Sequence, residues 1–162
     1  MDILVTYFSP TGTTKAIARE LADQVKADYF EIQPEKPYTA ADLNWKNPLA
    51  RCNREKVFNR GIACREKIGN FSDYEIVFIG FPIWYYQEPG IIDSFVEGYD
   101  WTGKKIILFA TSGGSDIQRA RKNLEDKIQG KIIAAKVLSG NAEIEEWVDR
   151  LDRILDFGEE NQ

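Results

Sequence analysis

Four short runs of the chain are apolar nearly throughout and rich in branched or aromatic residues. Runs that lack polar alternation are typical of strands covered on both faces, as in a parallel sheet. A shorter run, Tyr29 to Ile32, predicts a weaker strand. The four strong runs are Ile3 to Phe8, Ile76 to Phe81, Ile106 to Ala110 and Ile132 to Leu138.

Between these runs, apolar residues recur every three or four positions, which predicts amphipathic helices. A shorter helix is expected after Pro89, through Ile92 to Val96. Alternating strands and helices predict a three-layer α/β domain with right-handed crossovers, and the length favours one domain over residues 1–162. The three longer stripes are Ile17, Leu21 and Val25; Ile117, Ala120, Leu124 and Ile128; and Ile144, Trp147, Val148, Leu151 and Leu155.

The stretch 34–72 is the exception, because it is long and polar and joins the weak strand to the next strong one. We expect two short helices or a partly irregular cover there. Its apolar residues could anchor it to the rest of the domain. They are Leu43, Trp45, Leu49, Val57, Phe58 and Ile62.

Composition narrows the classes of function. A net charge of -5 argues against nucleic acid or an anionic membrane as the main partner, because both recruit basic surfaces. No apolar run approaches the ~20 residues of a membrane span, and no signal peptide precedes the first strand, so we expect a cytoplasmic protein. Two distant cysteines, Cys52 and Cys64, are expected to be reduced thiols.

The chain contains no histidine, which removes the commonest general base and the commonest zinc ligand. A Ser-His-Asp triad is impossible. We expect no metal site. The missing histidine also agrees with chemistry in which no side chain needs to act as a catalytic acid or base.

The loop after the first strand, Ser9-Pro10-Thr11-Gly12-Thr13-Thr14, is unusually rich in hydroxyl groups. Gly12 can adopt a positive φ, and the following helix presents free N–H groups and the positive end of its dipole. Together these could bind a phosphate without a cation. The loop matches neither the Walker A pattern nor the dinucleotide fingerprint. An ordinary helix N-cap is the alternative.

The second unusual stretch closes the strand at 76–81 and reads Phe81-Pro82-Ile83-Trp84-Tyr85-Tyr86-Gln87-Glu88-Pro89-Gly90. Three consecutive aromatic residues in a loop cannot all face one core, so at least one ring should be exposed. Exposed aromatic rings suit a flat aromatic ligand. A satellite hydrophobic cluster beneath the 34–72 segment is the alternative.

The third unusual loop, Ala110-Thr111-Ser112-Gly113-Gly114-Ser115-Asp116, ends a strand and precedes a helix. Its glycines would let backbone amides approach a ligand, and Ser115 or Asp116 could cap the helix. Taken alone, it is more typical of a plain glycine-rich turn between a strand and a helix.

The three loops in this order resemble those of the flavodoxins, particularly a bacterial flavodoxin-like group with short chains. That group carries a Ser/Thr-x-Thr-Gly-x-Thr loop, a Gly-x-Pro-Ile-Trp-Trp loop and a Thr-Ser-Gly-Gly-Ser loop. It also has a segment similar to Asp42-Leu43-Asn44-Trp45. The resemblance covers essentially the whole chain. It implies a flavodoxin-like three-layer sandwich with a five-stranded parallel sheet in the order 2-1-3-4-5, and FMN as the cofactor.

In that strand order the three loops follow neighbouring strands and converge on one crevice. The first loop would bind the FMN phosphate, Trp84 or a neighbouring tyrosine would stack on the flavin ring, and the third loop would supply backbone donors. The expected cofactor-binding residues are Ser9, Thr11, Gly12, Thr13 and Thr14; Pro82, Ile83, Trp84, Tyr85 and Tyr86; and Ser112, Gly113, Gly114, Ser115 and Asp116.

The sequence departs from the family pattern at three of these positions. Tyr85 stands where a second tryptophan is usual, Tyr86 where glycine is usual, and Thr13 where asparagine is common. In flavodoxins a peptide near the flavin flips when the ring is reduced. A bulky Tyr86 would oppose such a flip.

The resemblance implies an electron-transfer flavoprotein that shuttles electrons between redox proteins, as a monomer or weak dimer. Such a carrier needs a docking surface near the cleft, for which the candidates are Glu88, Asp93, Glu97 and Asp116. An ordinary solvated surface is the alternative for each of them.

The alternative is an NAD(P)H-dependent FMN quinone reductase, in which basic residues of the 34–72 segment meet a nucleotide phosphate. These are Arg51, Arg54, Lys56, Arg60 and Arg65. A third possibility is a non-redox binding module that has kept the fold and lost the cofactor.

Overall fold

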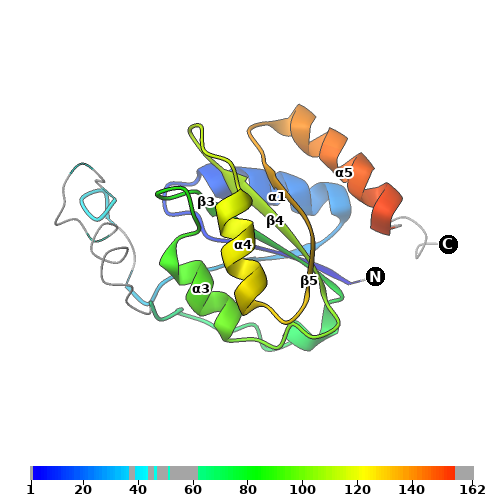
Figure 1. Ribbon diagram of the computed structural model, residues 1–162, viewed down its shortest axis with the longest axis horizontal. Coiled ribbons are helices and arrows are strands. Elements are labelled where there is room, and N and C mark those ends of the chain that lie inside the picture. The colour runs from blue at the N-terminus through cyan, green and yellow to red at the C-terminus, as the bar shows by residue number, and fades with distance from the viewer. Residues whose placement is uncertain (1, 37–38, 44–45, 47–50, 52–61, 156–162) are drawn as a thin grey trace.

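Five parallel strands form one sheet in the order β2-β1-β3-β4-β5 in the computed structural model of the protein (Figure 1). The structure describes residues 2–36, 39–43, 46, 51 and 62–155. The predicted fold class and strand order are confirmed. The strands are β1 (Ile3–Tyr7), β2 (Asp28–Glu31), β3 (Ile76–Pro82), β4 (Lys105–Thr111) and β5 (Lys131–Val137).

Helices cover both faces of the sheet, as the apolar strands require (Figure 1). α1 (Thr13–Val25) and α5 (Asn141–Leu155) contact each other and cover one face, and α3 (Gly90–Glu97) and α4 (Gln118–Lys127) cover the other. A short 3-10 helix, η1 (Phe71–Asp73), precedes β3. All four predicted helices are present.

The core accordingly has two halves separated by the sheet. Under α1 and α5, the ring of Trp147 packs edge-on against Phe78, with 6.3 Å between ring centroids. In the same half, a Cβ on Gly80 would lie 2.1 Å from the Phe109 ring, so glycine is required there. Under α3 and α4, Trp101 is buried and its indole N–H donates to Val96 O.

The 34–72 segment is described only in part. Ile62 is buried in the core, as expected, and Pro34 pairs with Cys64 in an antiparallel bridge beside β2. Residues 39–43 form a turn in which Leu43 N–H donates to Thr39 O. The other expected anchors lie outside the described residues, namely Trp45, Leu49, Val57 and Phe58.

Cys64 is a free, half-buried thiol, whereas Cys52 lies outside the described residues. In the described part of the chain, no helix combines the length and the apolar character that crossing a membrane would need. The same residues contain no cluster of histidine, cysteine, aspartate or glutamate that could bind a metal ion.

Candidate functional site

A cleft of about 770 Å³ opens at the carboxyl ends of β1, β3 and β4. This is the end of a parallel sheet at which doubly wound folds bind ligands. None of the described residues that line the cleft carries a charge. They come from all three unusual loops and from the 34–72 segment: Pro10, Thr11, Leu43, Pro82, Ile83, Trp84, Tyr85, Tyr86, Ser112, Gly113, Gly114 and Ser115.

The first loop ends in a set of free backbone donors. Gly12 is the N-cap of α1 and has φ 92, a conformation that favours glycine. The N–H groups of residues 11–14 have no acceptor among the described residues. The N–H of Lys15 is satisfied by Ser9 Oγ at 2.9 Å. Free N–H groups at a helix N-terminus bind anions, so this loop suits a phosphate.

Thr14 and Thr111 form a buried contact beneath the cleft. Their hydroxyl oxygens lie 2.8 Å apart, and both side chains are nearly inaccessible to solvent. The carbonyl of Thr111 also accepts the N–H of Ile83 at 2.9 Å. Thr111 therefore links all three loops, because it contacts Thr14 of the first loop and Ile83 of the second and directly precedes Ser112 of the third. Thr14, expected to bind the phosphate, therefore has its hydroxyl group in an internal hydrogen bond.

The aromatic residues form a tight two-residue turn. Trp84 and Gln87 exchange both backbone hydrogen bonds, at 2.9 and 3.1 Å, and enclose Tyr85 and Tyr86. The φ angles of Tyr85 and Tyr86 are 53 and 70, as in a type I′ turn. Such turns prefer asparagine and glycine, so both tyrosines carry backbone strain, of about 1–3 kcal/mol each.

The position at which the family usually has glycine thus keeps a glycine-like conformation in this chain. Tyr86 is 68% exposed at the mouth of the cleft, whereas Tyr85 and Trp84 are half-buried. Trp84 packs edge-on against Phe8, with 5.6 Å between ring centroids. Trp84, Tyr85 and Tyr86 together form an aromatic wall of the cleft. This wall contacts the core at Trp84 and is exposed to solvent at Tyr86.

The third loop is ordered by its own side chains. Ser112 Oγ accepts the N–H groups of Gly114 at 3.2 Å and Ser115 at 2.8 Å. Asp116 Oδ1 accepts the N–H of Gln118, the first residue of α4, at 3.1 Å. Asp116 therefore satisfies a donor at the start of the helix, and it does not line the cleft.

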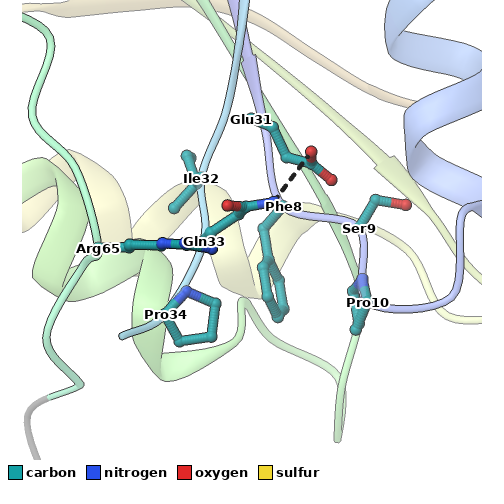
Figure 2. Close-up of a pocket in the computed structure, with 8 residues that line it drawn as sticks. All are labelled: Phe8, Ser9, Pro10, Glu31, Ile32, Gln33, Pro34 and Arg65. Atoms are coloured by element: carbon teal, nitrogen blue, oxygen red, sulfur yellow. Dashed lines mark hydrogen bonds between the residues drawn. The ribbon is translucent and has the colours of Figure 1, made fainter. Parts of the chain in front are cut away.

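A second, smaller pocket of about 170 Å³ adjoins the first loop on its β2 side (Figure 2). Figure 2 shows the ring of Phe8 between Pro10 and Pro34, with the side chain of Arg65 extended toward Gln33. The amide of Gln33 donates to Glu31 at 3.2 Å. Pro10 borders both pockets, so the loop separates them.

The basic residues of the 34–72 segment do not line the cleft where they are described. Arg65 lines the smaller pocket, and Arg51 Nη1 donates to Lys36 O at 2.6 Å. The remaining three, Arg54, Lys56 and Arg60, lie outside the described residues.

Of the acidic residues suggested as a docking surface, Glu88 is unsuitable, because its side chain is buried and only 3% exposed. Burial and the nearby charge of Asp93 raise the pKa of Glu88 to about 7. Asp93 itself lies 3.7 Å from Lys127 Nζ, and burial raises its pKa too. Glu97 and Asp116 remain exposed.

Two residues that line the cleft were absent from the expected set. Pro10 lies inside the hydroxyl-rich loop and has no polar side chain to single it out. Leu43 comes from the 34–72 segment. The sequence singled it out as an apolar anchor and as part of the family-like stretch 42–45, and neither signal assigned it to the cofactor site. Conversely, Ser9, Gly12, Thr13 and Thr14 belong to the first loop without lining the cleft itself.

Comparison with known proteins places this architecture in a family. The family model described as flavodoxin matches residues 2–151. The chain belongs to the flavodoxin family. The expectation drawn from the three loops is thereby confirmed. No curated protein matches the chain.

Solved structures agree with the family assignment. A candidate flavoprotein from Bacteroides eggerthii is 38% identical over 92% of this chain and 96% of its own, with a TM-score of 0.84. One from Bacteroides uniformis is also 38% identical, covers 91% and 97% of the two chains, and has a TM-score of 0.85. A Lactobacillus acidophilus flavoprotein in complex with FMN shares the fold, with 18% identity, coverage of 91% and 98%, and a TM-score of 0.68.

Proposed function

We propose that this member of the flavodoxin family binds FMN in the cleft and carries electrons between redox proteins. The observation that carries the proposal is the convergence of three loops on one cleft, in which the described lining residues carry no charge. The unpaired N–H groups of residues 11–14 adjoin this cleft, and the aromatic residues 84–86 line it. Clefts of about 300–1,000 Å³ are typical of cofactor sites, and this one lies in that range.

FMN, the expected cofactor, is confirmed by membership of the flavodoxin family, in which FMN binds at this switch point of the sheet. The L. acidophilus flavoprotein of the same fold was solved in complex with FMN. When bound, FMN supplies one- and two-electron redox chemistry, and the protein tunes it.

Each loop has a distinct part in this proposal. The N–H groups of residues 11–14 and the exposed hydroxyls of Thr11 and Thr13 bind the phosphate without a cation. Trp84 and the two tyrosines cover one side of the ring system. The loop 112–115 adds its serine and glycine residues to the lining of the same cleft. None of the described residues that line the cleft has to move a proton, in keeping with their lack of charge.

Electron transfer to a protein tests the carrier function. The FMN-loaded protein is reduced with dithionite without oxygen and mixed with oxidised cytochrome c, a basic one-electron acceptor. We expect rapid cytochrome reduction that slows as salt is added, because a chain of net charge -5 attracts a basic partner. Reduction no faster than that by free reduced FMN would contradict the proposal.

The second candidate is the NAD(P)H-dependent FMN quinone reductase. Leu43 favours it, because this residue brings the long 34–72 segment to the mouth of the cleft, where a substrate pocket would form. Rapid bleaching of the bound flavin by NADH or NADPH alone would support the reductase and contradict a pure carrier. Slow bleaching by both nucleotides would support the carrier.

A further inference from the structure

The smaller pocket beside the first loop has no part in the proposed FMN site. Its described lining comes from the carboxyl ends of β1 and β2, from the residues that follow them, and from Arg65 (Figure 2). This is again the end of the parallel sheet at which open α/β folds bind ligands. Among the described lining residues, the pocket and the cleft share only Pro10. A ligand bound in the smaller pocket would therefore leave the cleft free for FMN.

The smaller pocket opens where the hydrogen-bond ladder between β1 and β2 stops. The last bond of the ladder runs from Ile32 N–H to Tyr7 O at 2.6 Å. In the register of these two strands, the next bond would run from Ser9 N–H to Ile32 O. Neither of these two groups has a hydrogen-bond partner among the described residues. One backbone donor and one backbone acceptor, both from lining residues, are thus left for a ligand.

Two opposite charges line the same pocket without pairing with each other. Arg65 contributes a guanidinium group and Glu31 contributes a carboxylate. Within the described part of the chain, the guanidinium has no ion pair or hydrogen bond, and the carboxylate accepts only from Gln33 Nε2 at 3.2 Å. In the view of Figure 2, the Gln33 amide lies between the two charged side chains. The pocket therefore offers a positive group and a negative group at separate places.

The rest of the lining is mainly apolar. Figure 2 shows the ring of Phe8 between Pro10 and Pro34. Phe8 and Pro34 are buried and Pro10 is half-buried, so these three residues form a firm apolar surface. A small apolar side chain that covered this surface would gain from its removal from water.

These groups together select the chemistry of the ligand. A carboxylate can accept from the Arg65 guanidinium and from Ser9 N–H, and an ammonium group can donate to Glu31 and to Ile32 O. An anion without an amine would be repelled by Glu31, and a cation without a carboxylate would be repelled by Arg65. A pocket of about 170 Å³ admits only a small molecule.

We propose that the smaller pocket is a second ligand site, which binds a zwitterion with a short apolar side chain, of the chemical class of the aliphatic amino acids. The site is separate from the cleft, and the proposal does not depend on FMN binding.

NMR titration of the full chain with L-leucine tests the proposal, both with FMN and without it. We expect the resonances of the Ser9 amide and of the Arg65 Nε–H group to shift as leucine reaches millimolar concentrations, because both groups gain an acceptor. The shifts should be the same with and without FMN. If neither resonance moves up to the solubility limit of leucine, the proposal is overturned.

Two variants remove the charges of the pocket one at a time. Arg65→Gln and Glu31→Gln should each raise the dissociation constant of leucine by about tenfold, as for the loss of a hydrogen-bonded charge pair. Glutamine at position 31 keeps an acceptor for Gln33. Lys67→Gln and Glu35→Gln are the matched controls, because they make the same charge changes at exposed residues that do not line the pocket. Controls that weaken binding as much as the pocket variants would contradict a built site.

Analogues of leucine test whether both of its charges are recognised. Isocaproate lacks the ammonium group and isoamylamine lacks the carboxylate, so each should bind at least about tenfold more weakly than leucine. If either analogue binds as tightly as leucine, recognition of a zwitterion is overturned. Inorganic phosphate at equal concentration should not displace leucine. Displacement would overturn the proposal in favour of an Arg65 that binds a nucleotide phosphate.

Discussion

The hydroxyl oxygens of Thr14 and Thr111 lie 2.8 Å apart in the interior and join the start of α1 to the end of β4. This contact lies directly beneath the cleft, and the Thr111 carbonyl adds a bond to Ile83. The spacing of the three loops therefore depends on a hydrogen bond between two side chains that are 97 residues apart in sequence.

Replacing Thr111 by valine, which has the same shape, removes this bond and leaves the Thr14 hydroxyl buried alone. We expect the free energy of unfolding to fall by about 1–3 kcal/mol, the cost of an unsatisfied buried polar group. Urea unfolding measures the change. The exposed Thr102→Val is the matched control.

The double variant Thr14→Val with Thr111→Val separates the bond from general packing. Replacing both partners by apolar groups of the same shape can be nearly neutral, so the double variant should recover most of the lost stability. The single variant Thr14→Val is measured as well. If the free energy of unfolding of the double variant falls by the sum of the two single losses, this account of the contact is contradicted.

Tyr86 should be destabilising in its present conformation. It has φ 70 and is 68% exposed, so glycine would relieve backbone strain and lose little packing. We expect Tyr86→Gly to raise the free energy of unfolding by about 1 kcal/mol, less the extra entropy that glycine has in the unfolded chain.

Tyr29→Gly is the control for Tyr86→Gly, because Tyr29 is similarly exposed, at 54%, but lies in strand β2. Glycine in a strand is unfavourable, so this variant should be less stable than the wild type. Equal losses in both variants would show that the turn at Tyr86 is not strained.

Gly12→Ala should impair phosphate binding without a steric clash. A Cβ at Gly12 would meet no atom within 4 Å, but its φ of 92 is unfavourable for alanine. We expect the first loop to shift and FMN affinity to fall by about tenfold, which corresponds to roughly 1.4 kcal/mol. Fluorescence titration measures the change.

Riboflavin affinity should be nearly unaffected by Gly12→Ala, because riboflavin has no phosphate. Gly69→Ala is the control, since its Cβ would also meet open space and its backbone does not require glycine. An equal loss of affinity for FMN and riboflavin would contradict the assignment of this loop to the phosphate.

The pKa of Glu88, raised from 4.5 to about 7 in the folded chain, predicts a pH-dependent stability. Between these two values the folded chain binds more protons than the unfolded chain. The stabilisation is therefore fully present below about pH 4.5 and is lost as pH rises through about 7. Over this range the free energy of unfolding of the wild type should fall by up to about 3 kcal/mol relative to that of Glu88→Gln.

Urea unfolding of both proteins at a series of pH values checks this difference. Glu97→Gln should track the wild type, because Glu97 is exposed. If the free energies of unfolding of the wild type and Glu88→Gln differ by the same amount at every pH, Glu88 has an ordinary pKa.

β1, β3 and β4 were predictable because each is buried on both faces of the sheet and needs no polar alternation. β5 was predicted from its apolar run although it is an edge strand and is half-buried along most of its length. β2 was the weak prediction for a related reason. It is an edge strand, and Tyr29 in it is largely exposed. The meeting of the three loops followed from strand order, since neighbouring parallel strands end at the same edge.

Details of the site depended on contacts that sequence patterns do not contain. The buried carboxyl group of Glu88, in the loop before α3, contacts Asn123 of α4, 35 residues away in sequence. The place of Leu43 at the cleft depends on how a long irregular segment folds back. Tyr85 and Tyr86 have positive φ angles, which tyrosine rarely adopts. Because such turns prefer asparagine and glycine, the residue types at these positions did not predict a tight turn.

The visible absorption spectrum of the desalted protein, recorded after adding FMN and removing the excess, tests the central claim most directly. A retained flavin spectrum near one flavin per chain is the predicted result, because we propose that the unpaired N–H groups of residues 11–14 and the aromatic residues 84–86 hold the cofactor together. A colourless protein that cannot be reconstituted would contradict the account and favour the non-redox module.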